Sequence, residues 1–248
     1  MTPFDWLVSR PIAHRGLHDA ASGVIENTPS AFRAAVAARY SIECDLQVTA
    51  DGEAIVHHDF ALGRLTEGKG VLAQMSADAL KRVAFTGTTD RMITLGELCD
   101  LVAGRVPLVL EIKSRFEGER RLVDRVATVL SRYQGPVAAM SFDPEQVRML
   151  RERAPALARG IVAERWYRDP EWGERTWLQK QAMAHLLHAF RTAPHFVAYR
   201  VGDLPTAATS IARSIFRCPL LAWTVRTAEE RARAQRHASQ MIFEGFRP

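Results

Sequence analysis

The chain has 248 residues, of which 47% are hydrophobic and 25% are charged, with 15 Gly and 12 Pro. This composition excludes a disordered, collagen-like or low-complexity protein, and the length suffices for a large core without disulfides or a structural metal. The formal net charge is +5, and only four of the 33 basic residues are lysines. An arginine excess suits bidentate phosphate contacts, so a nucleic-acid or phosphate partner has to be weighed against a merely solvated surface.

The cysteines and the N-terminus indicate the compartment. Cys44, Cys99 and Cys218 lie far apart in the sequence, a spacing that fits neither a disulfide framework nor a thiolate zinc site. Residues 1–10 lack the basic region and the long apolar core of a signal peptide. No apolar run approaches the ~18 residues of a membrane-spanning helix. We therefore expect a cytoplasmic protein with no stable membrane insertion.

Local signals define the elements in the first part of the chain. Thr28 is a capping residue, and Pro29 stands at the first helical position, where its missing N–H costs nothing. Asp51-Gly52 is a hairpin signal between two strand-like runs. These signals predict a strand at 10–14, a helix at 29–39, strands at 41–48 and 54–57, and an irregular stretch at 60–92.

The rest of the chain alternates in the same way. Thr94 and Glu97 form a capping box, and Asp143 is placed to cap a further helix. We predict helices at 94–104, 117–132, 143–154, 174–191, 206–213 and 228–237. We predict strands at 106–112, 136–140, 158–162, 196–199, 220–225 and 241–243.

This alternation indicates the fold class. Strands that alternate with helices form a parallel sheet covered by helices. About eight such units in 248 residues, with no Pro-, Gly- or Ser-rich linker between them, fit a closed barrel better than an open sheet. The sequence therefore predicts an α/β fold, a single (β/α)₈ TIM barrel over residues 1–248, with a short insertion after the hairpin of the second strand.

Polar residues gather at the predicted strand ends, where TIM barrels carry their chemistry. The first strands end in His14-Arg15-Gly16, in Glu43 and Asp45, in His57-His58-Asp59, and in Glu111 and Lys113. A spacing of two places Glu43 and Asp45 on one strand face, and likewise Glu111 and Lys113. The sequence therefore predicts a group of histidines, carboxylates and cations in one barrel mouth.

The three carboxylates indicate a metal site. Ile42, Cys44 and Leu46 form the apolar face of their strand, so Glu43 and Asp45 would point into the barrel, where an unpaired charge is costly. Converging carboxylates do not all stay ionised without a cation between them, and oxygen ligands suit Mg²⁺ or Ca²⁺. Spacing alone leaves a solvated strand face open as the other interpretation.

Further sequence blocks accompany these strand ends. In chain order they are Ala13–Gly16, Glu26–Phe32, Ile42–Gly52, Ile55–Asp59, Leu65–Gly70, Leu110–Lys113, Ser141–Glu145 and Ala222–Val225. Together they resemble the glycerophosphodiester phosphodiesterases, a family of metal-dependent enzymes on a (β/α)₈ barrel. The resemblance runs from residue 13 to about 225, with a degenerate final strand near 241–246.

The resemblance implies a function and a set of site residues. The implied reaction is hydrolysis of glycerophosphodiesters to sn-glycerol 3-phosphate and an alcohol such as choline or ethanolamine. His14 and His58 would be the acid/base pair, since His58 rather than His57 matches the family's His-Asp dipeptide. The resemblance further implies one divalent cation held by Glu43, Asp45 and Glu111, and phosphate or substrate contacts from Arg15, Lys113, Glu26, Asn27 and Trp223.

Two alternatives remain beside this small-molecule phosphodiesterase. One is a lysophospholipase D or sphingomyelinase D-like lipid phosphodiesterase, and the other is a binding barrel that has lost catalysis. The retained histidines and carboxylates argue against the second, because a structural barrel would gain by replacing buried charge. Nucleic-acid binding is not expected, since arginines and glutamates are interleaved along helices, as in 228–236. The oligomeric state is left open.

Two departures from the family pattern concern the rim of the mouth. The last strand lacks the usual Asp-Gly pattern, so we expect the rim to differ there. Residues 165–177 contain three of the five Trp. We expect this segment to cover the mouth and to contact the alcohol group of the substrate, with packing of a surface loop or a dimer contact as the open alternative.

Overall fold

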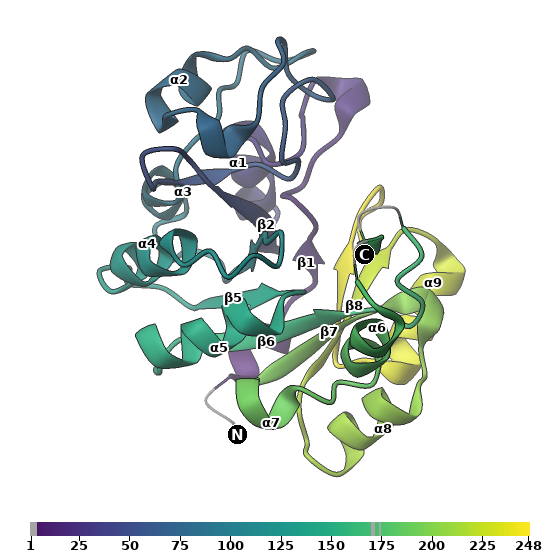
Figure 1. The fold of residues 1–248 in the computed structure, drawn as a ribbon. Coiled ribbons are helices and arrows are strands. Elements are labelled where there is room, and N and C mark those ends of the chain that lie inside the picture. Colours follow the sequence, from purple (N-terminus) through teal and green to yellow (C-terminus); the bar gives the residue numbers. More distant parts are fainter. Residues whose placement is uncertain (1–3, 170–171, 174) are drawn as a thin grey trace.

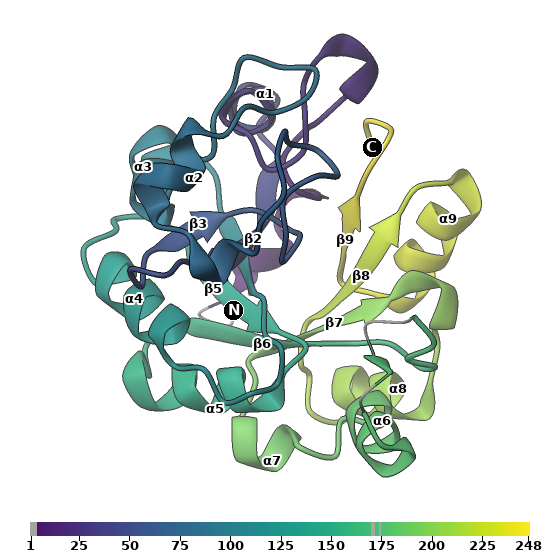
Figure 2. The same ribbon diagram turned by 45° about the horizontal axis from the view of Figure 1, so that its top comes forward.

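The computed structural model describes residues 4–169, 172–173 and 175–248. In these residues eight parallel strands form a closed barrel, and a ninth, antiparallel strand lies outside it (Figure 1, Figure 2). The barrel strands are β1 (Ile12–Ala13), β2 (Ser41–Val48), β4 (Leu108–Ile112), β5 (Val137–Ser141), β6 (Ala158–Ala163), β7 (Phe196–Arg200), β8 (Leu220–Val225) and β9 (Gln240–Phe243). β1 closes the barrel because it pairs with β2 on one side and with β9 on the other. The predicted TIM barrel is therefore confirmed.

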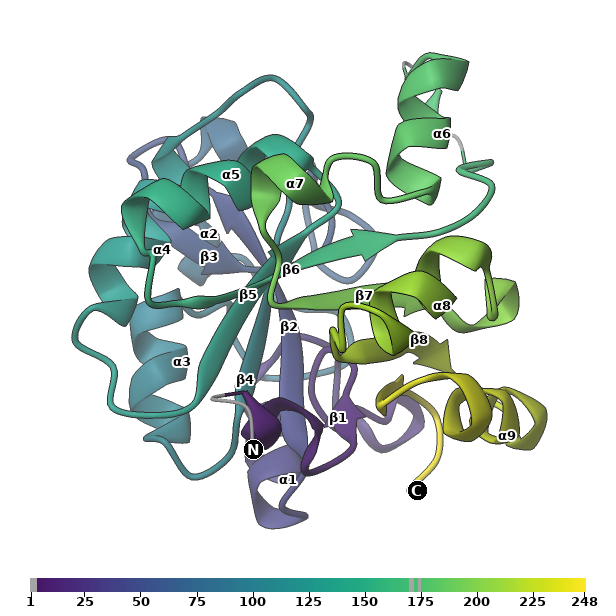
Figure 3. The ribbon, with the colours of Figure 1, turned by 90° about the horizontal axis from the view of Figure 1, so that it is seen from below.

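Helices cover the outside of the barrel (Figure 3). They are α1 (Pro29–Ala37), α2 (Ala77–Arg82), α3 (Leu95–Val102), α4 (Arg121–Leu130), α5 (Pro144–Arg153), α6 (Trp177–Ala184), α7 (Ala189–Thr192), α8 (Ala207–Ser214) and α9 (Ala228–His237). No helix in the described part of the chain is long and apolar enough to cross a membrane.

The core has two layers, and this arrangement aims the site residues inward. Ile42, Cys44 and Leu46 of β2 belong to the cluster between strands and helices. A second cluster fills the barrel interior and consists of Leu7, Ile12, Val109, Ala138, Met140, Ala158, Val162, Phe196, Ala198, Leu221 and Ile242. Because successive side chains of a strand point to opposite faces, Glu43 and Asp45 point into the barrel.

The insertion follows β3 (Ala54–Val56), which forms a hairpin with β2. Its apolar side chains Leu72, Leu80, Phe85 and Met92 form a small cluster with Ile25, which precedes α1, and Ile55 of β3. The sequence predicts no regular element in 60–92, whereas the structure contains α2, capped by Ser76, whose Oγ accepts from the Ala79 N–H. A helix of six residues is too short to show a 3.6-residue apolar period.

Two further predictions differ in detail. Thr28 precedes α1 as predicted, but its hydroxyl donates to the Ile25 carbonyl, and the carboxylate of Asp90 accepts from the Ser30 N–H instead. The insertion therefore caps α1. The single helix predicted at 174–191, whose residue 174 lies outside the described residues, is divided into α6 and α7 because Leu186 adopts a left-handed backbone, with φ 57°.

Candidate active site

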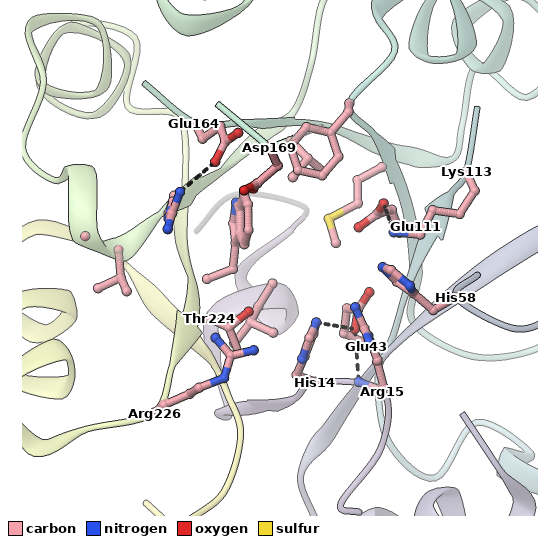
Figure 4. Close-up of a pocket in the computed structure, with 18 of the residues that line it drawn as sticks. His14, Arg15, Glu43, His58, Glu111, Lys113, Glu164, Asp169, Thr224 and Arg226 are labelled. Atoms are coloured by element: carbon pink, nitrogen blue, oxygen red, sulfur yellow. Dashed lines mark hydrogen bonds and ion pairs between the residues drawn. The ribbon is translucent and has the colours of Figure 1, made fainter. Parts of the chain in front are cut away.

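A cavity of about 330 Å³ opens at the carboxyl ends of the barrel strands. In Figure 4, two groups of side chains face each other across it. One group consists of the predicted residues His14, Arg15, Glu43, His58, Glu111 and Lys113, and the other contains Glu164 and Asp169, while Arg226 lies on the same side as His14. Trp223 also lines the cavity. The predicted strand ends therefore meet in one place.

A tight turn after β1 positions His14 and Arg15. Arg15 and Gly16 adopt positive φ angles of 55° and 81°. The Gly16 N–H donates to the Glu43 carbonyl at 3.2 Å, and a Cβ on Gly16 would lie 2.9 Å from the Cβ of Ala31 in α1. Only glycine satisfies both the backbone angle and this close approach.

Glu43, Asp45 and Glu111 come together on neighbouring strands. β2 and β4 pair in parallel with Asp45 opposite Glu111, and one oxygen from each of the three carboxylates lies within 4.8 Å of the others. All three side chains are buried. Burial raises the pKa of Glu43 well above its usual range, and the nearby Asp45 and Glu111 charges raise it further. Burial also raises the pKa of Glu111.

Arg15 and Lys113 offset part of this negative charge. Lys113 Nζ lies 2.9 Å from Asp45 Oδ1 and 2.5 Å from Glu111 Oε1, and Arg15 Nε lies 3.1 Å from Asp45 Oδ2. Burial opposes ionisation of Asp45, but Lys113 and Arg15 lower its pKa well below its usual range. Two cations among three carboxylates leave one negative charge uncompensated.

One buried atom shows where a further cation would fit. Glu43 Oε2 accepts from the Arg15 N–H at 3.0 Å, but Glu43 Oε1 is buried and has no hydrogen-bond partner among the described residues. A buried unpaired carboxylate oxygen is costly unless a cation satisfies it. The donor set consists of carboxylate oxygens alone, which suits a hard divalent ion.

The two predicted histidines have matching surroundings. His14 Nδ1 lies 2.6 Å from Glu244 Oε2, and His58 Nδ1 lies 2.7 Å from Asp59 Oδ1. A carboxylate at Nδ1 holds the proton on that nitrogen and leaves Nε2 to exchange a proton with a bound molecule. Burial lowers the pKa of both rings, that of His58 to about 4 with a contribution from Lys113.

His57 has a different environment from His58. Its side chain is buried, with its ring centroid 6.2 Å from that of Phe85 in the insertion, and it does not line the cavity. Of the two adjacent histidines, His58 therefore lines the cavity and His57 does not.

Glu26 and Asn27 lie behind the cavity instead of lining it. Asn27 Nδ2 donates to Asp45 Oδ2 at 2.8 Å, and Glu26 Oε1 accepts from Arg15 Nη1 at 2.7 Å. Glu26 also accepts from Arg64 Nη2, whose guanidinium binds Asp59 as well. In this structure both residues contact the site through Arg15 and Asp45.

Several residues of the site were not predicted from the sequence. Glu164 follows β6, Arg200 ends β7, Arg226 follows β8 and Glu244, which binds His14, follows β9. Arg200 Nη1 donates to Glu164 Oε2 at 3.0 Å, and Arg226 Nη2 donates to Glu244 Oε2 at 2.9 Å. All four stand at strand ends, so the same positional argument that selected Glu43 and Glu111 would have found them.

The tryptophan-rich segment divides into two environments. Trp172 is buried and lines the cavity, where its ring centroid lies 5.0 Å from that of Phe142. Phe142 in turn lies 5.4 Å from Trp223. Trp166 and Trp177 are 50% and 70% exposed. Residues 170, 171 and 174 of this segment lie outside the described residues.

Comparisons with known proteins identify the family of the chain. A family model described as the glycerophosphoryl diester phosphodiesterase family matches residues 14–243. A glycerophosphodiester phosphodiesterase from Caldanaerobacter subterraneus subsp. tengcongensis is 30% identical over 163 residues, with 61% of this chain and 65% of the relative covered. A putative glycerophosphodiester phosphodiesterase from Bacillus subtilis is 28% identical over 163 residues, with 61% of this chain and 64% of the relative covered. The chain thus spans slightly less than two thirds of the length of these relatives.

A solved structure supports the fold over nearly the whole chain. It is a phosphodiesterase from Oleispira antarctica in complex with the product sn-glycerol-3-phosphate, with a TM-score of 0.77 and 19% identity. The match covers 96% of this chain and 93% of that one. Because the family model spans almost all of the barrel, from His14 to Phe243, the chain belongs to the glycerophosphoryl diester phosphodiesterase family.

Proposed function

We propose that the protein hydrolyses glycerophosphodiesters to sn-glycerol 3-phosphate and an alcohol, with one bound divalent cation, Mg²⁺ or Ca²⁺. The observation that carries this proposal is that two carboxylate-bound histidines line one cavity together with Glu43 and Glu111, which form a carboxylate cluster with Asp45. The activity named for the two relatives and the product bound in the Oleispira antarctica structure support the substrate class.

Glu43, Asp45 and Glu111 would hold the cation. Their fit rests on the buried, unpartnered Glu43 Oε1 and on a donor set of carboxylate oxygens. When bound, the cation would neutralise charge on the nonbridging oxygens of the phosphodiester. Arg15 and Lys113, which lie beside the same carboxylates, would orient that phosphate through charge-assisted hydrogen bonds.

His14 and His58 would carry the two proton transfers. One ring accepts the proton of the glycerol hydroxyl next to the phosphate, and the freed oxygen attacks phosphorus. The bond from phosphorus to the alcohol oxygen breaks, and the other ring donates a proton to that oxygen. A cyclic phosphate results, and water opens it with the roles of the rings exchanged. The anionic substrate favours protonation of an adjacent ring, which offsets the effect of burial.

The far side of the cavity would bind the alcohol. Glu164 is 2% exposed, and its Oε1 has no partner among the described residues, although Oε2 accepts from Arg200. Asp169 and the rings of Phe142, Trp172 and Trp223 line the same cavity. A carboxylate beside aromatic rings attracts an ammonium group, so this side suits a cationic alcohol such as choline or ethanolamine.

The test is release of sn-glycerol 3-phosphate from glycerophosphocholine, with and without EDTA. We expect EDTA to abolish release and added MgCl₂ or CaCl₂ to restore it in the wild type, but not in Glu43→Gln. Absence of metal-dependent release from any glycerophosphodiester would overturn the proposal. Choline release from lysophosphatidylcholine, measured in parallel, tests the lipid phosphodiesterase alternative.

A further inference from the structure

The segment from Arg175 to Ala228 has an unusual charge distribution. It contains one of the 28 acidic residues of the chain, Asp203. Its basic residues are Arg175, Lys180, Arg191, Arg200, Arg213, Arg217 and Arg226. Arg200 and Arg226 lie at the cavity and are paired with Glu164 and Glu244, so the basic residues that the segment contributes to the surface away from the cavity include Lys180, Arg191, Arg213 and Arg217.

The same segment exposes large apolar side chains. On α6, Trp177 and Leu178 are 70% and 71% exposed, and on α7 Phe190 is 79% exposed. At the end of α8, Ile215 and Phe216 are 70% and 74% exposed. Among the described residues, Trp166 is the one strongly exposed large apolar side chain outside this segment. Such a concentration marks an interaction surface, because isolated apolar residues scattered over a protein need no partner.

The helices that carry these residues lie on the side of the barrel away from α1 (Figure 1, Figure 2, Figure 3). α6 and α8 lie near each other in Figure 2, and α7 packs beside α5. We call this side the α6–α8 face, and define it by Trp177, Leu178, Lys180, Leu187, Phe190, Arg191, Arg213, Ile215, Phe216 and Arg217. Its apolar residues do not line the cavity.

Acidic residues on the neighbouring helix α5 offset only part of the positive charge. α5 packs against α7 and carries Glu145 and Glu152, which form ion pairs with Arg148 of the same helix, although the charge of Arg191 also helps to lower the pKa of Glu145. Asp203 accepts from the backbone N–H of Arg165. The face therefore combines apolar side chains with basic ones whose charges are not matched within their own segment.

We propose that the α6–α8 face binds the surface of an anionic lipid membrane. Trp, Leu, Phe and Ile side chains enter the boundary between headgroups and acyl chains, and basic residues pair with lipid phosphates. A second copy of the chain is a poorer partner, because a twofold contact would set the same basic patch against itself. The binding is peripheral and needs no membrane-spanning helix.

Flotation with lipid vesicles tests this inference on the full chain. We expect the bound fraction to be at least about tenfold higher with vesicles of phosphatidylcholine and phosphatidylglycerol than with phosphatidylcholine alone, and to fall as salt rises. Phe190→Ser with Phe216→Ser should lower the bound fraction by about tenfold because two apolar anchors are lost. Hydrolysis of soluble glycerophosphocholine should be unchanged in this variant. Membrane binding by the α6–α8 face and phosphodiesterase activity are therefore tested separately, and failure of one leaves the other standing.

Two double variants with the same change in net charge test whether vesicle binding depends on the α6–α8 face or only on the net charge of the chain. Arg213→Glu with Arg217→Glu should abolish most binding. Arg33→Glu with Arg132→Glu makes the same charge change at exposed positions on α1 and after α4 and should retain it. Equal loss in both pairs, equal binding to neutral vesicles, or no vesicle binding at all would overturn the proposal. So would a dimer, seen by analytical ultracentrifugation, that Phe190→Ser with Phe216→Ser dissociates.

Discussion

His57 and His58 are adjacent in sequence but differ in what their rings touch. His58 lines the cavity and binds Asp59, whereas His57 is buried near Phe85. We expect His58→Ala to lower kcat for glycerophosphocholine at least about 100-fold, because a positioned acid or base contributes that much. His57→Ala should keep kcat within a few-fold, and its melting curve reports any loss of packing. The reverse result would show that the acid/base pair is misassigned.

Glu244 acts on the site through His14. Its Oε2 accepts from His14 at 2.6 Å and from Arg226 at 2.9 Å. We expect Glu244→Ala to lower kcat by roughly 10- to 100-fold with little change in KM, because the imidazole loses its orienting partner. Glu244→Gln, whose amide oxygen still accepts a hydrogen bond, should retain more activity. An unchanged kcat in Glu244→Ala would exclude this positioning role.

A substitution of Glu164 tests whether this side of the cavity binds the alcohol group of the substrate. Glu164→Gln keeps the size of the side chain but removes the charge, so we expect KM for glycerophosphocholine to rise about two- to fivefold. KM for glycerophosphoglycerol, whose alcohol is neutral, should stay nearly constant. Equal changes for both substrates would place the alcohol elsewhere.

The position of a residue along its strand explains which site residues could be predicted from the sequence. Glu43, Asp45 and Glu111 follow from strand ends and alternation, because burial of the opposite apolar face fixes where their side chains point. Glu164 and Glu244 stand at equivalent positions on later strands, but no motif there drew attention to them. The hydrogen bonds from the Ser30 N–H to Asp90 and from Asn27 to Asp45 depend on how the loops fold back on the barrel. The local spacing of residues in the sequence does not predict such contacts.

The turn between β1 and α1 is the element on which the site depends most. Gly16 combines a φ of 81° with a close approach to Ala31, whereas Gly52, in the β2–β3 hairpin, has a φ of 78°, and a Cβ added there would have no neighbour within 4 Å. Both Gly→Ala changes cost backbone strain, but only Gly16→Ala also forces β1 and α1 apart. We expect Gly16→Ala to lower the free energy of unfolding by about 2 kcal/mol more than Gly52→Ala, measured by urea denaturation.

A matching loss of activity should accompany that loss of stability. Displacing Gly16 moves His14 and Arg15, so kcat should fall in Gly16→Ala and not in Gly52→Ala. Equal stability of the two variants would mean that α1 shifts freely to accommodate the added methyl group.

At the scale of elements, strong local signals were the reliable ones. The capping box of Thr94 and Glu97 forms as predicted, and Asp143 caps α5. The buried strands were predicted to within a few residues, except that β1 covers only Ile12–Ala13, since Pro11 has no N–H to pair. α2 and the break at Leu186 were missed because short helices and left-handed residues other than Gly leave little trace in sequence.

At the scale of the whole molecule, charged residues with different proposed functions lie in different regions of the fold. The carboxylate cluster lies inside the barrel with Arg15 and Lys113, while arginines on the far side of the barrel lie among exposed apolar residues on the α6–α8 face. The net charge of +5 is the sum of these regions and describes neither of them. Only the position of each charge in the fold separates a binding site from a solvated surface.

The carboxylate cluster makes the stability of the whole barrel depend on a cation. An ion that binds only the folded state at about 100 times its Kd adds about 2.7 kcal/mol of stability, which raises Tm by roughly 5–10 °C for a chain of this size. We expect Mg²⁺ or Ca²⁺ to produce this rise in a thermal denaturation experiment and EDTA to reverse it. Glu43→Gln should lose the response, whereas Asp100→Asn, at an exposed acid on α3, should keep it.

The metal-free state of Glu43→Gln gives this experiment a second, independent readout. Burial and the neighbouring carboxylates raise the pKa of Glu43, so its ionised form destabilises the metal-free barrel at neutral pH. Removing the charge should therefore leave the Tm in EDTA equal to or above that of the wild type, while the metal-induced rise disappears. A lower Tm in EDTA together with an intact response to the ion would show that Glu43 stabilises the barrel by its own hydrogen bonds and is not a ligand.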